Sequence, residues 1–584
     1  MLKIEDFRIY FMQKKWEIDK TLEPPEKQIV LQLATEQKCP FIIAELLYKK
    51  NLTNSELLQK FFYPSLSMLH DPFLFNDMSV AVKRIVQAID TGEKITIYGD
   101  YDVDGTTATA LLYLGLKELN AVIDYYIPHR IIDGYGLSIN CLEHLRTNGT
   151  SLIITVDCGI IATEEVEAVK SMGMEIIITD HHNSKSVLPD AFAIINPRID
   201  KCKYPYKDLA GVGVAYKVLM AVYTYLGINC EEKTLKYLDL VALGTIADIV
   251  PLTEENRVFA TIGMTHLAVR QNIGLNALMN IAGYINKSPD TNDIVFGIAP
   301  RINAAGRMGS AMRAVELLIT NDVSRGQELA EIIERENSIR QQIDHKTYDE
   351  VNEIITKKYK NLEETYCIVL SSDNWHPGVI GIVASKLIEK YHKPAILISY
   401  NEGIGSGSGR SIPNFDLFKA LEDSEEFLES FGGHKYAVGL SILPEYIDPF
   451  EKKLSEYIKN NYDLKQIKPP LKINKKLELY DITYKFMEWL GKFAPFGVSN
   501  NMPIFYTEQV MVHGYPYNVG KNHLKLKVKK DGCELDLIGF NLGDYLPLLK
   551  NNSRLDIAYT LELASWQGKT NIQGNLKDLQ LYES

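Results

Sequence analysis

Three aspartates at alternate positions follow an apolar segment of the chain. Residues 95–107 read ITIYGDYDVDGTT, which places Asp100, Asp102 and Asp104 directly after a stretch typical of a buried strand. In an extended chain such residues point to one face, about 7 Å apart. Their carboxylates repel each other unless a cation lies among them, and Gly105 permits a sharp turn there. The segment predicts a divalent-metal site, with a solvated acidic turn as the alternative.

Polar residues also follow later apolar segments, and their types suit the same kind of ion. Asp157 follows SLIITV, Asp180, His181 and His182 follow MEIIIT, and Asp248 ends another apolar run. Carboxylates combined with an imidazole suit Mn²⁺ or Mg²⁺, and one carboxylate could bridge two ions. Two ions about 4 Å apart can activate a water molecule and stabilise a phosphoryl displacement. The combined set therefore predicts a two-metal hydrolase.

Each of these residues has a simpler interpretation when taken alone. His181 and His182 could be a surface pair or a helix cap, and Asp157 could cap a helix after Gly159. Cys158 is expected to be a small buried residue. Polar clusters at the ends of three successive apolar segments are hard to explain in this way, so the joint pattern favours a metal centre.

The elements that would position these residues follow from the spacing of apolar residues. Residues 76–255 alternate strand-like runs with amphipathic helical stretches, and the runs read KITIYGD, AVIDYYIP, SLIITVD, MEIIITD and FAIINP. This alternation predicts an α/β fold with a doubly wound, mainly parallel sheet. Ligands bind at the carboxyl ends of the strands in such sheets, which is where the polar residues lie.

The flanking regions have different patterns. Residues 1–75 predict a helical N-terminal segment. Residues 256–360 predict a linker region that ends in one long helix over 322–360, with a break near Asp344 as an alternative. Residues 361–460 predict a second α/β domain, with glycine-rich turns at GIGSGSGRS and FGGHKYAVG.

The final region, residues 461–584, predicts a β-rich domain with a hairpin at Asp531–Gly532 and a turn at Gln567–Gly568. A row of lysines on one face of the hairpin would lie opposite acidic residues. Such cross-strand pairs, worth about 0.2–1 kcal/mol each, explain the lysines without nucleic acid. The lysines are Lys525, Lys527 and Lys529, with Lys527 opposite Asp536 and Lys529 opposite Glu534.

Composition and charge exclude several classes of protein. The 584 residues suggest about three to five domains, and 46% hydrophobic with 24% charged residues is typical of a globular protein. No apolar run approaches the ~18 residues of a membrane span, and the N-terminus lacks a signal-peptide core. Seven scattered cysteines without C-x-x-C favour a reducing cytosol over a disulfide framework or zinc ribbon. A net charge of −12 disfavours a nonspecific nucleic-acid coat protein but allows an acidic centre neutralised by metals.

Four motifs of the chain resemble, in order, those of the DHH phosphoesterases. They are GDYDVDG (99–105), VDCG (156–159), TDHH (179–182) and GTIADIVPL (244–252). GSGRS (407–411) and FGGHKYAVG (431–439) resemble the associated DHHA1 domain, and the β-rich tail resembles an OB-fold, a common single-strand-binding module. Over essentially its full length the chain is similar to the single-strand-specific 5′→3′ exonucleases of this superfamily. The segments that carry this similarity are PRINAAGRM (300–308), WHPGVIGIVASK (375–386), PFG (495–497) and HLKL (523–526).

The resemblance implies a set of ligands for two Mn²⁺ or Mg²⁺ ions. One ion would be held by Asp104, Asp157, His181 and Asp248, and the other by Asp102 with the bridging Asp157, with Asp100 as a further candidate.

The resemblance also implies roles beside the metals. His182 would contact the scissile phosphate or assist proton transfer, and Asp180 would orient the histidines. Many members of the superfamily have a histidine where this chain has Tyr98, so Asp100 or water is expected to complete the ligands of that metal.

Substrate contacts are expected mainly from the second lobe. The glycines of GSGRS let the backbone approach an anion, and Arg410 supplies a forked donor to phosphate. An ordinary glycine-rich turn with a surface arginine is the alternative. Tyr135 could stack on a base or be a core tyrosine. The other expected substrate-binding residues are Arg301, Asn303, Arg307, His376, Ser408, Ser411, Gly433 and His434.

These observations favour a metal-dependent exonuclease that degrades single-stranded DNA from its 5′ end to mononucleotides in repair and recombination. One alternative is a DHH phosphodiesterase acting on short oligonucleotides or signalling dinucleotides. Another is a non-catalytic single-strand-binding scaffold. Single-stranded DNA is the expected partner, with a single-strand-binding protein and a helicase as further candidates. We expect a cytoplasmic monomer without membrane association.

Overall fold

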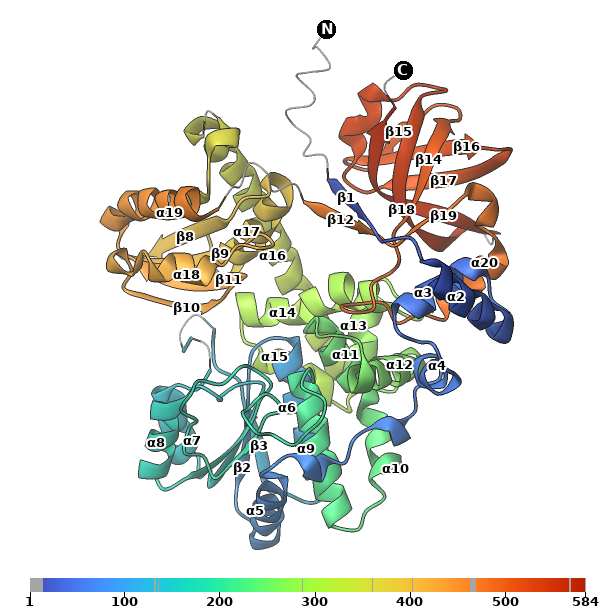
Figure 1. Cartoon of the computed structure of the whole chain (residues 1–584). Coiled ribbons are helices and arrows are strands. Elements are labelled where there is room, and N and C mark those ends of the chain that lie inside the picture. The colour runs from blue at the N-terminus through green and yellow to red at the C-terminus, as the bar shows by residue number, and fades with distance from the viewer. Residues whose placement is uncertain are drawn as a thin grey trace. The chain divides into compact units, whose positions relative to one another are not determined.

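The computed structural model describes residues 14–130, 133–134, 136–285, 287–359, 361–401, 403–462, 469–566 and 569–582. Tyr135 and the expected turn at Gln567–Gly568 lie outside these residues. The chain divides into two compact units, of which the first comprises Met1–Pro64, Gln466–Phe496 and Asn500–Ser584. The second comprises Ser65–Lys465 and Gly497–Ser499. Figure 1 labels most of the helices and strands of both units.

Five described strands of the second unit form a wholly parallel sheet in the order β3-β2-β4-β5-β6. They are β2 (Ile95–Gly99), β3 (Ile123–Tyr126), β4 (Leu152–Val156), β5 (Glu175–Thr179) and β6 (Ala193–Ile195). These are the five predicted strands. Every residue of β2 and β4 is buried, which explains why both read as continuous apolar runs.

Helices cover both faces of this sheet because side chains alternate along each strand. Ile97 and Ile154 pack into one core with α5 (Met78–Thr91), α6 (Val103–Lys117) and α9 (Gly211–Tyr225). Their neighbours Tyr98 and Ile153 pack into a separate core with α7 (Ile139–Thr147) and α8 (Thr163–Ser171). The predicted doubly wound α/β fold is confirmed.

A helical region follows the sheet. Its elements are α10 (Cys230–Thr234), α11 (Leu238–Ala247), α12 (Glu254–Val269), α13 (Ile273–Ile281), a π-helix (Asp293–Ile298), α14 (Ala299–Met308), α15 (Met312–Ile319) and α16 (Val323–Lys358). The apolar run before Asp248 is the helix α11. The predicted long helix is confirmed as α16, which continues through Asp344 without a break. Asp344 is buried, and its carboxylate accepts a hydrogen bond from Lys386 Nζ at 2.6 Å.

A second, mixed sheet has the order β10-β11-β9-β8-β7. Its elements are β7 (Ile368–Ser372), α17 (Pro377–Tyr391), β8 (Ala395–Asn401), β9 (Ile404–Arg410), α18 (Leu417–Glu422), β10 (Ser430–His434), β11 (Ala437–Ile442) and α19 (Ile447–Asn461).

The prediction of a glycine-rich turn at GIGSGSGRS is wrong, because that segment forms strand β9, whereas FGGHKYAVG does contain a turn, at Lys435 and Tyr436 between β10 and β11. The glycines are needed for packing between strands. A Cβ atom on Gly405 would lie 2.7 Å from Ile398 Cγ2, and one on Gly407 would lie 2.6 Å from Leu440 Cδ1. Large aliphatic side chains of the neighbouring strands therefore cover these glycines.

The first unit joins N-terminal helices to a β-rich domain. Helices α2 (Pro24–Gln37), α3 (Phe41–Lys49) and α4 (Ser55–Phe62) share a core with the C-terminal strands, and β1 (Lys15–Ile18) pairs in parallel with β12 (Pro470–Ile473). The larger sheet comprises β13 (Lys475–Lys476), β14 (Phe505–Val512), β15 (Tyr517–Val519), β16 (His523–Lys530), β17 (Cys533–Gly539), β18 (Arg554–Trp566) and β19 (Lys569–Leu581). The short helix α20 (Tyr484–Gly491) was not predicted.

The predicted hairpin joins β16 to β17, with Lys527 opposite Asp536 and Lys529 opposite Glu534. Lys527 Nζ lies 3.5 Å from Glu534 and 3.8 Å from Asp536, so it forms one diagonal and one direct ion pair with the neighbouring strand. Elsewhere, none of the helices in the described ranges combines the length and apolar character that a membrane crossing requires.

Candidate metal centre

The carboxyl ends of three adjacent parallel strands bring the predicted ligands together. Asp100 follows β2, Asp157 follows β4, and the segment from Asp180 to His182 follows β5. Because β2, β4 and β5 are neighbours in the sheet, these ends meet at one edge. Asp248 reaches the same place from the end of helix α11. The predicted convergence of the four motifs is thus observed.

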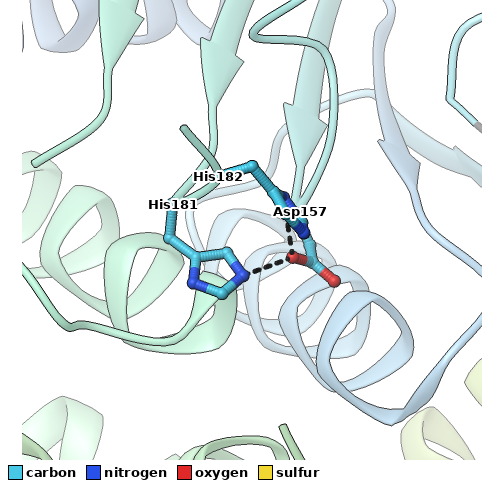
Figure 2. Close-up of side chains that lie close together, drawn as sticks. All are labelled: Asp157, His181 and His182. Atoms are coloured by element: carbon cyan, nitrogen blue, oxygen red, sulfur yellow. Dashed lines mark ion pairs between the residues drawn. The ribbon is translucent and has the colours of Figure 1, made fainter. Parts of the chain in front are cut away.

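Ligand atoms of these residues form three groups, each with all its atoms within 4.8 Å of one another. Asp157 belongs to two of the groups, as expected for a bridging carboxylate. The groups are Asp104, His181 and Asp248; Asp100, Asp102 and Asp157; and Asp157, His181 and His182. Figure 2 shows both imidazole rings next to the Asp157 carboxylate.

Several of these atoms are buried without a hydrogen-bond partner in the described part of the chain. They are Asp100 Oδ1, Asp157 Oδ1, His181 Nε2 and Asp248 Oδ2. His181 Nε2 lies 3.1 Å from Asp157 Oδ1 and 3.6 Å from Asp248 Oδ2. A buried polar atom without a partner costs about 1–3 kcal/mol. A cation among these atoms would remove that cost, so the residues present fit divalent metal ions.

The electrostatics of the cluster agree with this fit. Burial, reinforced by neighbouring carboxylates, raises the pKa values of Asp100, Asp157 and Asp248 well above their usual range. The same causes raise the pKa of Asp104 to about 7. Burial lowers the pKa of His181 to about 3, so its imidazole is neutral and can act as a ligand. A bound divalent cation would favour the ionised form of these carboxylates and so lower their pKa values.

The backbone at Asp157 has an uncommon conformation. Its φ is 60°, in the left-handed region, directly after strand β4. Helix α8 begins only at Thr163, and Ala162 is its N-cap, so the interpretation of Asp157 as a helix cap is wrong. A left-handed conformation of a residue other than glycine costs free energy and persists only where the surrounding structure holds it in place. Such residues are often found at functional sites.

The first motif is held by helix N-termini. Asp102 Oδ1 accepts hydrogen bonds from the amides of Asp104 (2.9 Å) and Gly105 (3.1 Å) at the start of α6. The two oxygens of Asp104 accept from the amides of Gly211 (2.6 Å) and Val212 (2.8 Å) at the start of α9. Gly105 lies within α6 and not at the expected sharp turn; glycine is required there by close approach, because a Cβ atom would lie 2.5 Å from Asp100 O.

Sequence reasoning missed Gly211, whose type is set by close approach to two predicted ligands. A Cβ atom on it would lie 2.8 Å from Asp157 Cβ and 3.0 Å from Asp104 Oδ2. The glycine pair in AGVGVAY was the available signal.

Asp180 contacts both histidines of the motif. Its Oδ1 accepts from the amides of His181 (2.7 Å) and His182 (3.0 Å) and contacts His182 Nδ1 at 2.8 Å, while Oδ2 accepts from the Ile160 amide. Burial opposes ionisation of Asp180, but the contacts with His182 outweigh it and lower the pKa of Asp180. Burial likewise opposes protonation of His182, but Asp180 raises its pKa. The surface-pair interpretation of the histidines is wrong, since His181 is 5% exposed.

Tyr98 does not take the place of a metal ligand. Its side chain is fully buried, and its hydroxyl donates to Gly136 O at 3.0 Å. It packs in the core beside α7 and α8, which also contains Cys158, a buried residue as predicted. Asp100, on the other hand, lies in a candidate ligand group with Asp102 and Asp157.

Three arginines form a basic cluster in the second unit. Burial, together with Arg130 and Arg410, lowers the pKa of Arg307 to about 10, and burial with Arg130 lowers that of Arg410. Arg307 donates to Gly378 O at 3.0 Å, and Arg410 donates to Ser408 Oγ at 3.1 Å. Among the described residues none of the three has an ion pair with a carboxylate. Such a cluster suits a phosphate group.

Arg130 was missed by sequence reasoning. Its guanidinium lies 4.8 Å from the centre of the Tyr101 ring, within the first motif. The only available signal was a basic residue close to the GYG segment that contains Tyr135.

The other expected substrate contacts have structural partners. Arg301 forms an ion pair with Glu334 at 2.5 Å, and Asn303 Oδ1 accepts from the Val103 amide at 3.1 Å. His376 Nδ1 caps α17 by accepting from Gly378 N at 3.0 Å. Ser411 Oγ donates to Phe415 O at 2.9 Å. Gly433 and His434 are exposed on β10. Roles of these residues toward a substrate stay predictions.

Three family models match the chain. The DHH family N-terminal domain matches residues 94–245, the DHHA1 domain matches residues 364–460, and the RecJ OB domain matches residues 473–578.

Curated proteins resemble the chain over most of its length. The single-stranded-DNA-specific exonuclease RecJ of Bacillus subtilis is 36% identical over 572 residues, covering 97% of this chain and 71% of that protein. The protein of the same name from Haemophilus influenzae is 35% identical over 525 residues, covering 87% and 91%.

Solved structures resemble it as well. RecJ from Thermus thermophilus in complex with Mn²⁺ matches with a TM-score of 0.83 and 26% identity, covering 98% of this chain and 80% of that one. An exonuclease RecJ bound to manganese matches with a TM-score of 0.59 and 33% identity, covering 69% and 99%.

Proposed function

The chain belongs to the RecJ family of DHH phosphoesterases, and on this basis we propose that it is a metal-dependent exonuclease specific for single-stranded DNA. It hydrolyses the strand from its 5′ end and releases 5′-mononucleotides in DNA repair and recombination. The observation that carries the proposal is the set of histidine and carboxylate ligand groups, two of which share Asp157, at the carboxyl edge of β2, β4 and β5.

The metal ions are two Mn²⁺ or Mg²⁺. Asp104, Asp157, His181 and Asp248 would hold one, and Asp102 with Asp157 the other, joined by Asp100 in place of the histidine absent at Tyr98. When bound, such ions supply an activated water molecule and stabilise the charge on the phosphate. The proposal is supported by the buried ligand atoms that lack hydrogen-bond partners in the described residues.

The chain's own groups position the phosphodiester. The contact of Asp180 with His182 Nδ1 fixes the orientation of that ring, so that its other nitrogen can contact the scissile phosphate or transfer a proton. Arg410 would grip the terminal 5′-phosphate, because its forked donors suit paired phosphate oxygens. Its position beside Arg130 and Arg307 supports this assignment. Gly381 makes room for it, since a Cβ atom there would lie 3.0 Å from Arg410 Nη2.

Domain limits are a further part of the proposal. We place a helical segment at residues 1–75, the DHH domain at 76–255, a linker region at 256–360, the DHHA1 domain at 361–460 and the OB-fold-like domain at 461–584. The family-model matches at 94–245, 364–460 and 473–578 support this division. Cytoplasmic location, a monomeric state, and interaction with a single-strand-binding protein and a helicase are further parts of the proposal.

Product analysis with defined substrates tests the proposed function. With Mn²⁺, a long single strand labelled at its 5′ end should release labelled mononucleotides first, whereas a 3′ label should stay on long fragments. Circular single strands should resist, and blunt duplex should be a poor substrate. Sustained digestion from the 3′ end or cleavage of circles would contradict the proposal. Preference for dinucleotides would favour the short-substrate phosphodiesterase, and binding without hydrolysis would favour the scaffold.

A further inference from the structure

The backbone that follows Asp248 is held in an unfavourable conformation. Ile249 has φ 60°, in the left-handed region, which is an outlier for a β-branched residue. Its side chain is 59% exposed, so burial of that side chain does not account for the conformation. Such a backbone persists only when its surroundings hold it in place. The amide of Ile249 donates to Ile246 O at 3.3 Å, and further restraint comes from contacts of the residues that follow.

Three hydrogen bonds within the second unit supply this restraint. Pro251 O accepts from the hydroxyl of Tyr206 at 3.0 Å and from Asn256 Nδ2 at 3.0 Å. The amide of Leu252 donates to Val498 O at 2.9 Å. These contacts fix the segment directly after Asp248.

Asn256 makes a second contact, with the segment that leads to the residues supporting Asp104. Its Nδ2 also donates to Asp208 O at 2.5 Å. Residue 208 lies three positions before Gly211, whose amide, with that of Val212, holds the carboxylate of Asp104. One amide group therefore joins the segment that carries Asp248 to the segment that holds Asp104. Both carboxylates belong to the same candidate ligand group with His181.

The environment of Asn256 makes this arrangement costly. The residue is fully buried, and its Oδ1 has no hydrogen-bond partner among the described residues. An apolar side chain at this position would avoid the penalty of a buried, unpaired oxygen. The two hydrogen bonds of Nδ2 offset this penalty. They join the segment after Asp248 to the segment before Gly211, and both segments support the metal centre.

We propose that Asn256 is a positioning residue of the metal centre, which keeps Asp248 and Asp104 at the separation that a shared ion requires. The inference rests on the proposed function, because it presupposes that these residues bind metal. Residues that orient metal ligands without touching the ion commonly change metal affinity about 10- to 100-fold when they are replaced.

Titration of the full chain with Mn²⁺, followed by calorimetry, tests this role directly. Asn256→Ala should weaken Mn²⁺ binding about tenfold or more and lower kcat, whereas KM for single-stranded DNA should be unchanged. Wild-type Mn²⁺ affinity in the folded Asn256→Ala protein would overturn the inference. Absence of Mn²⁺ binding by the wild-type chain would instead contradict the proposed function itself.

Thr507 provides a matched control in the first unit. It is fully buried, and its hydroxyl donates to Leu477 O at 2.6 Å and contacts the Tyr559 hydroxyl at 2.8 Å. Thr507→Ala should lower Tm to a similar extent but leave Mn²⁺ affinity unchanged. An equal loss of Mn²⁺ affinity in Thr507→Ala would show that general destabilisation explains the effect, and would overturn the inference.

A milder variant covers the case in which Asn256→Ala does not fold. Tyr206→Phe removes the other side-chain donor to Pro251 O and keeps the ring that is buried there. It should weaken Mn²⁺ binding about threefold, in keeping with the loss of one hydrogen bond. Unchanged Mn²⁺ affinity in Tyr206→Phe would then overturn the inference.

Discussion

Nε2 of His181 lies 3.1 Å from Oδ1 of Asp157, although neither atom has a hydrogen-bond partner among the described residues (Figure 2). Burial lowers the pKa of the imidazole to about 3 and raises the pKa of the carboxyl group, so burial disfavours an ion pair between them. Two electron-donating atoms that face each other in this way suit a shared cation.

Asp157→Asn should stabilise the metal-free protein but impair metal binding and hydrolysis. Removing one of several repelling carboxylates should raise the Tm of the metal-free protein, because repulsion within the cluster falls. Wild-type protein at a Mn²⁺ concentration of 100 times Kd should gain about 2.7 kcal/mol in its free energy of unfolding, and the variant should gain much less. Hydrolysis should fall more than about 100-fold, while binding of single strands survives.

Thermal unfolding in EDTA and in Mn²⁺ measures both effects of Asp157→Asn. Asp190→Asn is the control, because Asp190 is an exposed carboxylate that pairs with Lys170. An unchanged Mn²⁺-dependent shift in Asp157→Asn would contradict the bridging role.

The two histidines should respond differently to replacement by alanine. His181→Ala should lose Mn²⁺ affinity, because His181 belongs to two candidate ligand groups and its ring is buried among them. His182→Ala should keep most of the affinity and lose about 10²- to 10⁴-fold in kcat, the range expected for a group that transfers a proton. Metal titration combined with kinetics would show the reverse pattern if the two roles are exchanged.

Asp180→Asn should act through His182. The substitution removes a charged acceptor from His182 Nδ1 at 2.8 Å and weakens the acceptor for the amides of His181 and His182. We expect kcat to fall about 10- to 100-fold with a smaller change in Mn²⁺ affinity. In the double variant with His182→Ala, the two effects should not add, because both act on one ring. Full additivity in kinetic measurements would argue against this coupling.

Arg410→Ala should weaken the preference for strands that carry a 5′-phosphate. Its guanidinium lies in a basic cluster without ion-pair partners in the described residues, so its charge is available to an anion. Competition between phosphorylated and hydroxyl-ended strands measures the preference, and Mn²⁺ affinity should be unchanged. Arg325→Ala is the control, since Arg325 is already paired with Glu316 and Glu328. Equal effects of the two substitutions would show that Arg410 does not bind the terminal 5′-phosphate.

Lys527→Ala tests whether the lysines of the β16–β17 hairpin are structural. Lys527 is paired with Glu534 and Asp536, and exposed pairs of this kind contribute about 0–1 kcal/mol. We expect a small loss in the free energy of unfolding and unchanged affinity for single-stranded DNA. A large loss of affinity that disappears at high salt would indicate a contact with phosphate instead.

The sequence by itself determined the parallel sheet and the convergence of the metal-binding motifs. Short apolar runs rich in β-branched residues, such as SLIITV, are typical of strands covered on both faces, and the residue after each such strand lies at the carboxyl edge. Asp100, Asp157 and His181 could therefore be placed together without coordinates. The long helix α16 was equally predictable, because its pattern is local.

Only the tertiary structure decided how the site is supported, since the contacts concerned join residues that are distant in sequence. Asn303 accepts from the amide of Val103, 200 positions away, and Arg301 pairs with Glu334 once α14 packs on α16. The glycines of β9 resemble a turn until the aliphatic side chains of β8 and β11 are seen to cover them. The left-handed backbone of Asp157 and Ile249 is likewise imposed by surrounding hydrogen bonds and packing, which no local pattern of residue types encodes.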